Sequence, residues 1–400
     1  MRVLLFTTHY PATDAPLRGL YNQQAFAALG RHVEVRVVGA TAWWKKRKRP
    51  KDLLIAQRED AFGLDASFPV MWSIPGMHSL HARATTLSVR RFVSRLRQEF
   101  PFDIMIASWA YPDCVAAASL AQTAGCPLIS LVLGSDINDL GSREAIRPQI
   151  VWGLQQADRI VAVSHALAAS VARLGIPHSR LRVQHNAVNG DRFAIRPKQE
   201  ACSRLQLDGE RPRIAFIGRL SEEKGASVLL DAIERLRKRP GTRDVELCLV
   251  GSGQLDAELR ERARALGIES NVRFAGAQSH DEIPWWISAC DVLCLPSFRE
   301  GCPNVVLEAL ASGRPVVASG VGGIPELVSS SNGILVPAGD PAALSDGLQT
   351  AIGRHWDPRA LRGSVEFLSW DAVARFYLSL IEEVLEGRQG AEQAQSVRMS

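Results

Sequence analysis

Residues 213–237 read RIAFIGRLSEEKGASVLLDAIERLR, and their pattern indicates the fold class. The run 213–217 is apolar after its first residue, Arg213, and has the length of a buried strand, whereas residues 227–237 repeat apolar side chains at helical spacing. The intervening turn, residues 218–225, carries glycines and charged side chains. A strand that passes through a short turn into a helix is the repeating unit of a parallel sheet covered by helices, so this stretch predicts an α/β protein.

The same unit recurs in both halves of the chain, and stretches with helical periodicity separate the predicted strands. Four hundred residues suit two domains better than one, because a single hydrophobic core stops growing beyond about 250–300 residues. The pattern therefore predicts two Rossmann-like, doubly wound α/β domains. Apolar runs of strand length occur at residues 3–7, 33–38, 104–107, 128–132 and 159–163, and again at 213–217, 245–250, 272–274, 292–295, 316–318 and 334–336.

The break between the two predicted domains falls at residues 188–212, where Asn, Gly, Asp, Pro and Lys collect. We place an N-terminal domain at residues 1–190 and a C-terminal domain at residues 191–370. A helix predicted at 371–386 follows the second sheet, and we expect it to cross back onto the first domain. The last residues, 387–400, are polar and Gln-rich and are expected to form a flexible tail.

The composition excludes several classes of protein. The chain is 46% hydrophobic and 22% charged, and no apolar run approaches the roughly 20 residues that a membrane-spanning helix needs. The apolar run at the N-terminus is too short for the core of a signal peptide. Seven scattered cysteines show neither a CxxC pair nor metal-ligand spacing, so we expect buried thiols, a reducing compartment and no metal site. These features favour a cytoplasmic globular protein.

Positive charge is concentrated in the first half of the chain. Residues 1–200 hold 25 Lys and Arg against 15 Asp and Glu, whereas residues 201–400 hold 22 against 27. The densest run, from Trp43 to Lys51, reads WWKKRKRPK. Indole rings settle at headgroup depth and cations attract anionic lipid, so the run predicts peripheral attachment to the inner face of the plasma membrane. A solvated basic loop is the alternative; nucleic-acid binding is a third interpretation that nothing else supports, so we expect no nucleic-acid partner.

The turn at residues 218–225 places two cations where ligands bind in such folds. Turns from strand to helix line the carboxyl edge of a parallel sheet, which is the ligand-binding edge of Rossmann-like domains. Arg219 and Lys224 lie in this turn. Two fixed cations suit a diphosphate, which gains charge when it becomes a leaving group. The alternative is a surface charge cluster without a ligand.

A second cluster, SFREGCPNVVLEA at residues 297–309, follows another predicted strand. Asn304 has the residue type of a helix N-cap, and the N–H groups of the first turn, including that of Val305, would point at an anion with the help of the helix dipole. Glu308 lies about 6 Å further along the helix axis, within reach of a bound nucleoside. Glu300 precedes the helix, and a carboxylate accepts hydrogen bonds from paired sugar hydroxyls. A solvated helix face is the alternative for Glu308.

Together these motifs resemble the C-terminal half of the retaining glycosyltransferases of family 4 (glycosyl transferases group 1). The match is dense over residues 215–340 and looser over the rest of the chain. The resemblance implies the GT-B fold, in which two Rossmann-like domains face a central cleft. The matching motifs, in order, are Gly218-Arg219-Leu220 with Lys224-Gly225, Val250-Gly251-x-Gly253, the E-x7-E pair Glu300/Glu308, Gly313-x-Pro315-Val316-Val317-Ala318, Gly322-Gly323-Ile324-Pro325-Glu326 and Asn332-Gly333-x-Leu335-Val336-Pro337-x-Gly339-Asp340.

The resemblance also implies roles for individual residues. The two cations and the amides at the start of the helix would bind the diphosphate of a UDP- or GDP-linked sugar, and no cofactor is expected. Glu300 would contact the transferred sugar and act in catalysis, and Glu308 would accept hydrogen bonds from the ribose hydroxyls. The donor-binding residues implied in this way are Gly19, Gly218, Arg219, Lys224, Asn304, Val305 and Glu308.

The N-terminal half matches the family less closely. Arg18-Gly19-Leu20 resembles the glycine loop that meets the donor phosphates, although the family often has two adjacent glycines there. Leu133 occupies the position where many members place a histidine near the reacting sugar. Asp136, in the same loop, is therefore our preferred catalytic candidate in this domain. Further candidates at the same edge are His9, Ser108 and Trp109.

The chain contains no Asp-x-Asp motif, which argues against a metal ion that bridges the diphosphate. The predicted activity is metal-independent transfer of a sugar, with retention of configuration, to a glycan or lipid-linked acceptor in polysaccharide or glycoconjugate biosynthesis. A departing phosphate oxygen would take the acceptor proton, which makes a dedicated base unnecessary. Two alternatives are a nucleotide-sugar epimerase of the same architecture and a non-catalytic scaffold that binds sugar nucleotide.

Overall fold

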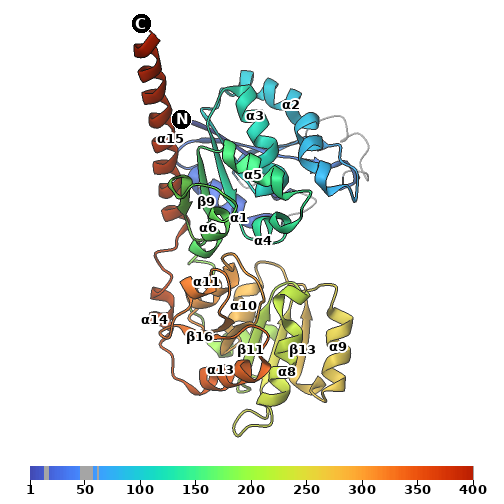
Figure 1. The fold of residues 1–400 in the computed structure, drawn as a ribbon. Coiled ribbons are helices and arrows are strands. Elements are labelled where there is room, and N and C mark those ends of the chain that lie inside the picture. The colour runs from blue at the N-terminus through green and yellow to red at the C-terminus, as the bar shows by residue number, and fades with distance from the viewer. Residues whose placement is uncertain (13–17, 46–56, 61–62, 400) are drawn as a thin grey trace. The chain divides into compact units, whose positions relative to one another are not determined.

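The computed structural model describes residues 1–12, 18–45, 57–60 and 63–399 and divides into two compact units (Figure 1). Unit 1 comprises Met1–His185 together with Trp370–Ser400, and unit 2 comprises Asn186–Ser369. Each unit is built on a mostly or wholly parallel sheet with helices on its faces. The fold class predicted from the alternating strands and helices is confirmed.

The sheet of unit 1 has eight strands in the order β10-β9-β8-β7-β1-β2-β5-β4. Neighbouring strands are parallel except for β4 and β5, which pair antiparallel at one edge. Strands β7 and β8 are buried along their whole length, as expected for parallel strands covered on both faces. The strands are β1 (Arg2–Thr7), β2 (Glu34–Gly39), β4 (Gln57–Asp60), β5 (Asp65–Phe68), β7 (Ile104–Ser108), β8 (Leu128–Val132), β9 (Arg159–Ala162) and β10 (Leu181–Val183), and β3 (Thr41–Ala42) pairs separately with β6 (Val70–Met71).

The C-terminal helix α15 (Trp370–Met399) belongs to unit 1 and packs against α1 (Leu20–Leu29). The rings of Phe26 on α1 and Tyr377 on α15 stack with centroids 5.7 Å apart, and Tyr377 is completely buried. Residues 387–399, expected to form a flexible tail, are helical because Ala, Gln, Glu and Arg favour a helix. The other helices of unit 1 are α2 (His81–Glu99), α3 (Val115–Ala124), α4 (Ser135–Asn138), α5 (Arg147–Gln156) and α6 (His165–Ala172).

The sheet of unit 2 has six parallel strands in the order β13-β12-β11-β14-β15-β16. The strands are β11 (Arg213–Ile217), β12 (Glu246–Val250), β13 (Val272–Gly276), β14 (Val292–Leu295), β15 (Val316–Ser319) and β16 (Gly333–Val336). The helices are α7 (Lys198–Leu205), α8 (Ala226–Leu236), α9 (Asp256–Ala265), α10 (Ile283–Ser288), α11 (Asn304–Ala311), α12 (Ile324–Leu327), α13 (Pro341–Gly353) and α14 (Pro358–Gly363).

Helix α8 shows why the quoted stretch folds as it does. Its apolar stripe, which includes Leu229, Ile233 and Leu236, is completely buried in the core of unit 2. Leu344 and Leu348 of the neighbouring helix α13 belong to the same hydrophobic cluster, together with inward side chains of β11 and β12. Helical periodicity in the sequence thus becomes a buried face against a parallel sheet.

Candidate functional site

The strand order of unit 2 reverses between β11 and β14. Strands β12 and β13 extend from one side of β11, whereas β14, β15 and β16 extend from its other side. At such a switch point the loops at the carboxyl ends of the two central strands diverge, and ligands bind in the crevice between them. We call these two loops, residues 218–225 and 296–303, the switch loops. They carry both clusters that the sequence singled out.

Two glycines allow a close approach of the backbone at these loops. Gly225 has φ +68°, and a Cβ there would lie 2.1 Å from the Pro296 carbonyl oxygen. Gly322 has φ +54°, and a Cβ there would lie 1.9 Å from the Glu300 carbonyl oxygen. Any other residue at either position would combine a steric clash with left-handed backbone strain. These motif glycines therefore fix the spacing of the loops that carry the charged residues.

A pocket of about 530 Å³ opens at the switch loops. Arg219 and Arg299 in its wall are exposed, and neither forms an ion pair or a side-chain hydrogen bond within the described residues. Two such cations beside one pocket suit a negatively charged ligand. The sequence analysis predicted Arg219 as a donor-binding residue but assigned no role to Arg299. The position of Arg299 directly before Glu300 could have indicated a role in the same site. The lining residues are Arg219, Ser221, Glu222, Glu223, Gln254, Phe298 and Arg299.

Lys224 and Glu300 form an ion pair that joins the two switch loops. Lys224 Nζ lies 2.6 Å from Glu300 Oε1, and Ser297 Oγ donates to the same oxygen at 2.7 Å. The side chain of Glu300 is only 8% exposed, whereas that of Lys224 is 25% exposed. Neither residue lines the pocket itself, but each is adjacent in sequence to a lining residue, Glu223 or Arg299. The structure thus brings these two predicted residues into direct contact.

Helix α11 begins at Asn304, and Pro303 rather than Asn304 occupies the N-cap position. The expectation of an Asn304 N-cap is wrong because its side chain is engaged elsewhere, where Oδ1 accepts a hydrogen bond from Asn186 Nδ2 at 2.6 Å. The backbone N–H groups of Asn304 and Val305 have no partner within the described residues, whereas that of Val306 donates to the Pro303 carbonyl at 3.1 Å. The helix therefore keeps two free donors and the positive end of its dipole for an anion.

Asn186 was not among the site residues predicted from the sequence. Its Nδ2 donates to the Cys302 carbonyl at 2.8 Å as well as to the side chain of Asn304. Its own Oδ1 is buried without a hydrogen-bond partner. The amide therefore fixes the end of the second switch loop against the start of α11, and it leaves one acceptor for a ligand or water.

Glu308 lies one turn into α11 and forms no side-chain hydrogen bond within the described residues. Burial raises the pKa of its carboxyl group to about 7, and the guanidinium of Arg192 opposes that rise. Desolvation without a hydrogen-bonding partner is costly for a carboxylate, so this group is suited to accept hydrogen bonds from a ligand that enters the site. The predicted position of Glu308, on a helix that starts at the switch loops, is confirmed.

Unit 1 has a switch point of its own between β1 and β7. Gly19 directly precedes α1, and a Cβ there would lie 2.2 Å from the His9 carbonyl oxygen. Asn22 Nδ2 donates to the same carbonyl at 2.7 Å, and Asn22 Oδ1 accepts from Ser108 Oγ at 2.6 Å. Contacts of His9 and Asn22 thus link candidate residues that the sequence singled out at this edge. The ring of His9 stacks on that of Trp109 with centroids 4.7 Å apart.

Asp136 does not present a free carboxylate. Its side chain is completely buried, and it accepts hydrogen bonds from the backbone N–H groups of Ala110 at 2.9 Å, Leu133 at 3.1 Å and Gly134 at 2.7 Å. Burial raises the pKa of the carboxyl group, and these backbone hydrogen bonds oppose the rise. The expectation that this side chain faces a reacting sugar is therefore corrected, because the carboxylate holds the loop at Leu133 against the end of β7.

Asp113 is a second buried carboxyl group in unit 1, and the sequence did not single it out. It accepts hydrogen bonds from Thr8 N at 2.6 Å and Thr7 Oγ1 at 3.0 Å, while its Oδ1 has no partner. Burial raises its pKa to about 7 against the opposing effect of these hydrogen bonds. An acidic residue inside segment 110–118, which has no other charged side chain, was the available signal. Asp113 connects the loop after β1 to the segment after β7.

Comparison with known proteins identifies the family. The profile described as Glycosyltransferase Family 4 matches residues 23–192, and the profile described as Glycosyl transferases group 1 matches residues 211–354. D-inositol 3-phosphate glycosyltransferase of Salinispora arenicola is 31% identical over 312 residues, which cover 72% of this chain and 67% of that enzyme. The chain belongs to glycosyltransferase family 4.

Two further similarities agree with this identification. The 2-deoxystreptamine N-acetyl-D-glucosaminyltransferase of Streptomyces fradiae is 31% identical over 239 residues, but the match spans only 59% of this chain and 56% of that enzyme. The crystal structure of Anabaena HepE in complex with UDP superposes with a TM-score of 0.74 at 19% identity and covers 96% of this chain and 100% of HepE. That likeness supports the GT-B fold of this glycosyltransferase.

These findings favour a transferase over the epimerase and scaffold alternatives. Among residues 1–12, 18–45, 57–60 and 63–399, no helix is both long and apolar enough to span a bilayer. The basic run predicted to attach to a membrane lies outside the described residues from position 46 to position 51.

Proposed function

We propose that this glycosyltransferase transfers a sugar from a UDP- or GDP-linked donor to a glycan or lipid-linked acceptor, with retention of configuration and without a metal ion. The observation that carries the proposal is the composition of the switch point in unit 2. One pocket there has unpaired Arg219 and Arg299 in its wall, and the adjoining α11 starts with two free N–H groups. Positive charge and free donors at one edge suit a diphosphate.

The donor nucleotide is bound from both switch loops. Arg219 and Lys224 contact the diphosphate, and the amides of Asn304 and Val305 donate to its oxygens. Gly218, at the end of β11, keeps the backbone clear of the phosphates. Glu308 accepts hydrogen bonds from the ribose hydroxyls, since its carboxyl group has no competing partner within the described residues. UDP in the structure of the similar protein HepE supports a nucleotide donor.

Glu300 contacts the transferred sugar and also holds Lys224 in place. The 2.6 Å ion pair between the two side chains positions the ammonium beside the pocket before a donor arrives. When the sugar leaves, the diphosphate gains negative charge, and the ammonium, the guanidinium groups and the α11 dipole stabilise it. These fixed charges supply what a bridging metal ion would supply in other enzymes.

Retention follows if the acceptor hydroxyl attacks from the face that the nucleotide leaves. A departing phosphate oxygen then takes the acceptor proton, so the Leu133 position needs no histidine. Asp136 acts as a positioning residue, because its carboxylate is bound by three backbone N–H groups. In unit 1, Gly19 keeps the start of α1 close to the His9 carbonyl. The basic run at 43–51 attaches the enzyme to an anionic membrane surface that presents a lipid-linked acceptor.

Thermal unfolding with UDP, GDP, ADP and their sugar conjugates, in the presence of EDTA, tests this proposal. A nucleotide at about 100 times its dissociation constant adds roughly 2.7 kcal/mol of stability, which is easily measured. We expect stabilisation by one uridine or guanosine nucleotide despite the chelator, and its loss in Arg219→Ala and Glu308→Ala. Arg243→Ala, an exposed arginine of unit 2 far from the switch loops in sequence, is the matched control. Stabilisation that appears only when Mg²⁺ or Mn²⁺ replaces EDTA would refute metal independence, and none with any nucleotide would refute the donor site.

A further inference from the structure

Large exposed apolar side chains of unit 1 gather around helix α2. Isolated exposed apolar residues are ordinary on protein surfaces, whereas a contiguous group marks an interaction site. Their exposed fractions range from 39% for Trp152 to 59% for Ile74. The group consists of Trp72, Ile74, Met77 and Leu80, which precede α2, of Leu87 on α2 and of Trp152 on α5.

Hydrogen bonds tie the segment before α2 to α2 and α5, and a shared groove brings two of these side chains together. Trp72 N donates to Ser88 Oγ of α2 at 2.9 Å, and Gln149 Nε2 of α5 donates to the Ser79 carbonyl at 2.9 Å. Leu87 and Trp152 line a common groove of about 410 Å³ between α2 and α5. The apolar side chains therefore stand on a fixed scaffold rather than on independent segments.

Unpaired arginines surround the apolar group. Arg83, Arg90, Arg91 and Arg95 are exposed on α2, and none forms an ion pair or a side-chain hydrogen bond within the described residues. A second groove, of about 800 Å³, is lined by Arg90, Arg91 and Arg97 and shares Leu87 with the first. We call the six apolar residues and the four exposed arginines together the α2 face.

We infer that the α2 face docks onto the surface of an anionic lipid bilayer. Tryptophan rings settle at headgroup depth, aliphatic side chains enter the acyl boundary, and arginines bind lipid phosphates. Trp72, Ile74 and Leu87 are each more than half exposed, at 54%, 59% and 58%. Projecting side chains of this kind suit a fluid layer, which adapts its shape to them.

Charge argues against a second copy of the chain as the occupant. A two-fold dimer through this surface would place the arginines of one copy near those of the other, and like charges repel. A bilayer that contains acidic lipid instead supplies opposite charge along the whole of α2. The inference deepens the membrane attachment proposed above by assigning it a second surface, which does not include residues 46–51, and it is independent of the donor and of the reaction.

Flotation of the full-length protein with vesicles tests the inference. The vesicles contain phosphatidylcholine alone or phosphatidylcholine mixed with phosphatidylglycerol. We expect Arg90→Gln/Arg91→Gln to weaken binding to the acidic vesicles about 30-fold, because each cation near such a surface strengthens binding roughly fivefold. Ile74→Gln/Leu87→Gln should weaken it about tenfold or more through lost insertion. Matched controls in unit 2 are Arg243→Gln/Arg359→Gln for charge and Phe367→Gln, 70% exposed in the wild type, for apolar area.

The controls should bind the acidic vesicles as the wild type does, and all variants should keep the wild-type unfolding temperature because the substituted side chains are exposed. Wild-type binding by both α2-face variants would overturn the inference, as would equal losses in the unit 2 controls. A dimer that sedimentation detects without lipid and that only the α2-face variants dissociate would also overturn it in favour of an interface between copies. Nucleotide-dependent stabilisation, measured on the same variants, reports separately on the donor site.

Discussion

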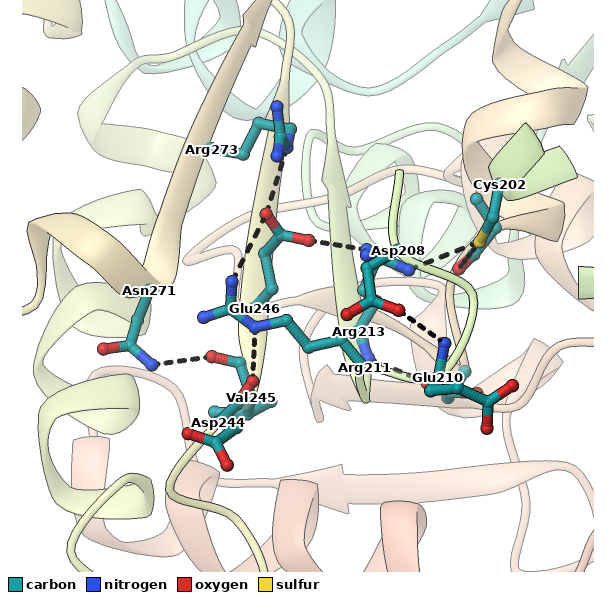
Figure 2. A network of polar contacts seen from close by, with 12 residues as sticks. Cys202, Asp208, Glu210, Arg211, Arg213, Asp244, Val245, Glu246, Asn271 and Arg273 are labelled. Carbon is teal, nitrogen blue, oxygen red and sulfur yellow. Dashed lines mark hydrogen bonds and ion pairs between the residues drawn. The ribbon is translucent and has the colours of Figure 1, made fainter. Parts of the chain in front are cut away.

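The two edges of the unit 2 sheet contain the same kinds of charged residue but pair them differently. At the amino edge, Arg213 is 1% exposed and its Nε donates to Glu246 Oε2 at 2.6 Å (Figure 2). The other oxygen of Glu246 accepts from Arg273 Nε at 3.0 Å, and Arg213 also donates to Cys202 Sγ at 3.3 Å. At the carboxyl edge, Arg219 and Glu308 have no such partners within the described residues.

This difference separates charges that stabilise the fold from charges that serve a ligand. The Arg213–Glu246 pair is enclosed by its own hydrogen-bond partners, so it needs nothing from outside and offers nothing to a ligand. The fold holds Arg219 and Glu308 in place through β11 and α11 but leaves their polar atoms unpaired. A bound donor would supply the hydrogen-bond and ion-pair partners that these side chains lack within the protein. Residue type does not distinguish Arg213 from Arg219, whereas their partners do; Lys224 and Glu300, also at the carboxyl edge, are paired with each other.

Removal of Glu246 should have the largest effect, and it should act on stability. Glu246→Ala leaves the Arg213 guanidinium buried and unpaired, which costs about 3–5 kcal/mol of unfolding free energy. Guanidinium chloride denaturation measures this loss, and Glu261→Ala on the surface of α9, 73% exposed in the wild type, is the control. We expect nucleotide affinity of the folded Glu246→Ala protein to be unchanged. A stable variant with weakened nucleotide binding would show that the amino edge also serves the ligand.

Removal of Lys224 should act on turnover instead. Lys224→Ala should lower kcat/KM about 100- to 1,000-fold, because a fixed cation stabilises charge on the leaving diphosphate. Unfolding free energy should fall by less than in Glu246→Ala, since Lys224 is 25% exposed and Ser297 still donates to the carboxylate of Glu300. Lys238→Ala, whose ion pair with Glu234 lies on the surface of unit 2, is the control. Glu300→Ala in the Lys224→Ala background should cost less than it does alone, because the two residues act as one unit; full additivity would contradict the proposed coupling.

Glu308 should produce the smallest effect, a pH dependence. Its folded-state pKa, about 7, lies above the ordinary value of 4.5, so the protonated form favours the folded state. Its contribution to stability is complete below pH 4.5 and is lost as the pH rises through 7. Compared with Glu308→Gln, the wild type should therefore lose stability across this interval by an amount on the order of 2 kcal/mol. Denaturation curves at a series of pH values measure the difference.

Nucleotide affinity should show the opposite trend. If the ionised carboxylate accepts hydrogen bonds from ribose hydroxyls, affinity should fall up to about tenfold for each pH unit below 7, because a proton must leave on binding. Glu308→Gln should bind more weakly and with a flat profile over the same range. Parallel profiles in the two proteins would remove Glu308 from the ribose site.

Sequence patterns predicted most of the fold because its information is local. The helical stripe of α8 and the apolar runs of the strands are visible without any tertiary knowledge. Motif order likewise brought Arg219, Lys224 and Glu300 to one switch point, since short turns at the carboxyl ends of adjacent strands must be neighbours.

The sequence could not predict properties that depend on contacts between distant segments. Asp136 has the residue type of a catalyst, but an amide 26 positions away, that of Ala110, helps to enclose it. Asn304 has the residue type of an N-cap, but Asn186, 118 positions away, takes its side chain. Asp113 went unnoticed because its partners, Thr7 and Thr8, come from the first strand and the residue after it. Each case reflects a tertiary hydrogen bond that leaves no periodic signal.

The place of helix α15 has a consequence for synthesis on the ribosome. Unit 2 lies between two parts of unit 1 in the chain, so its sheet can be complete while unit 1 still waits for residues 370–399. Until they emerge, the side of α1 that α15 later covers, including the ring of Phe26 under Tyr377, lacks this cover. At about 5–20 residues per second, the second domain to be translated has time to fold before the first is finished. Unit 1 is therefore completed only after α15 has been synthesised.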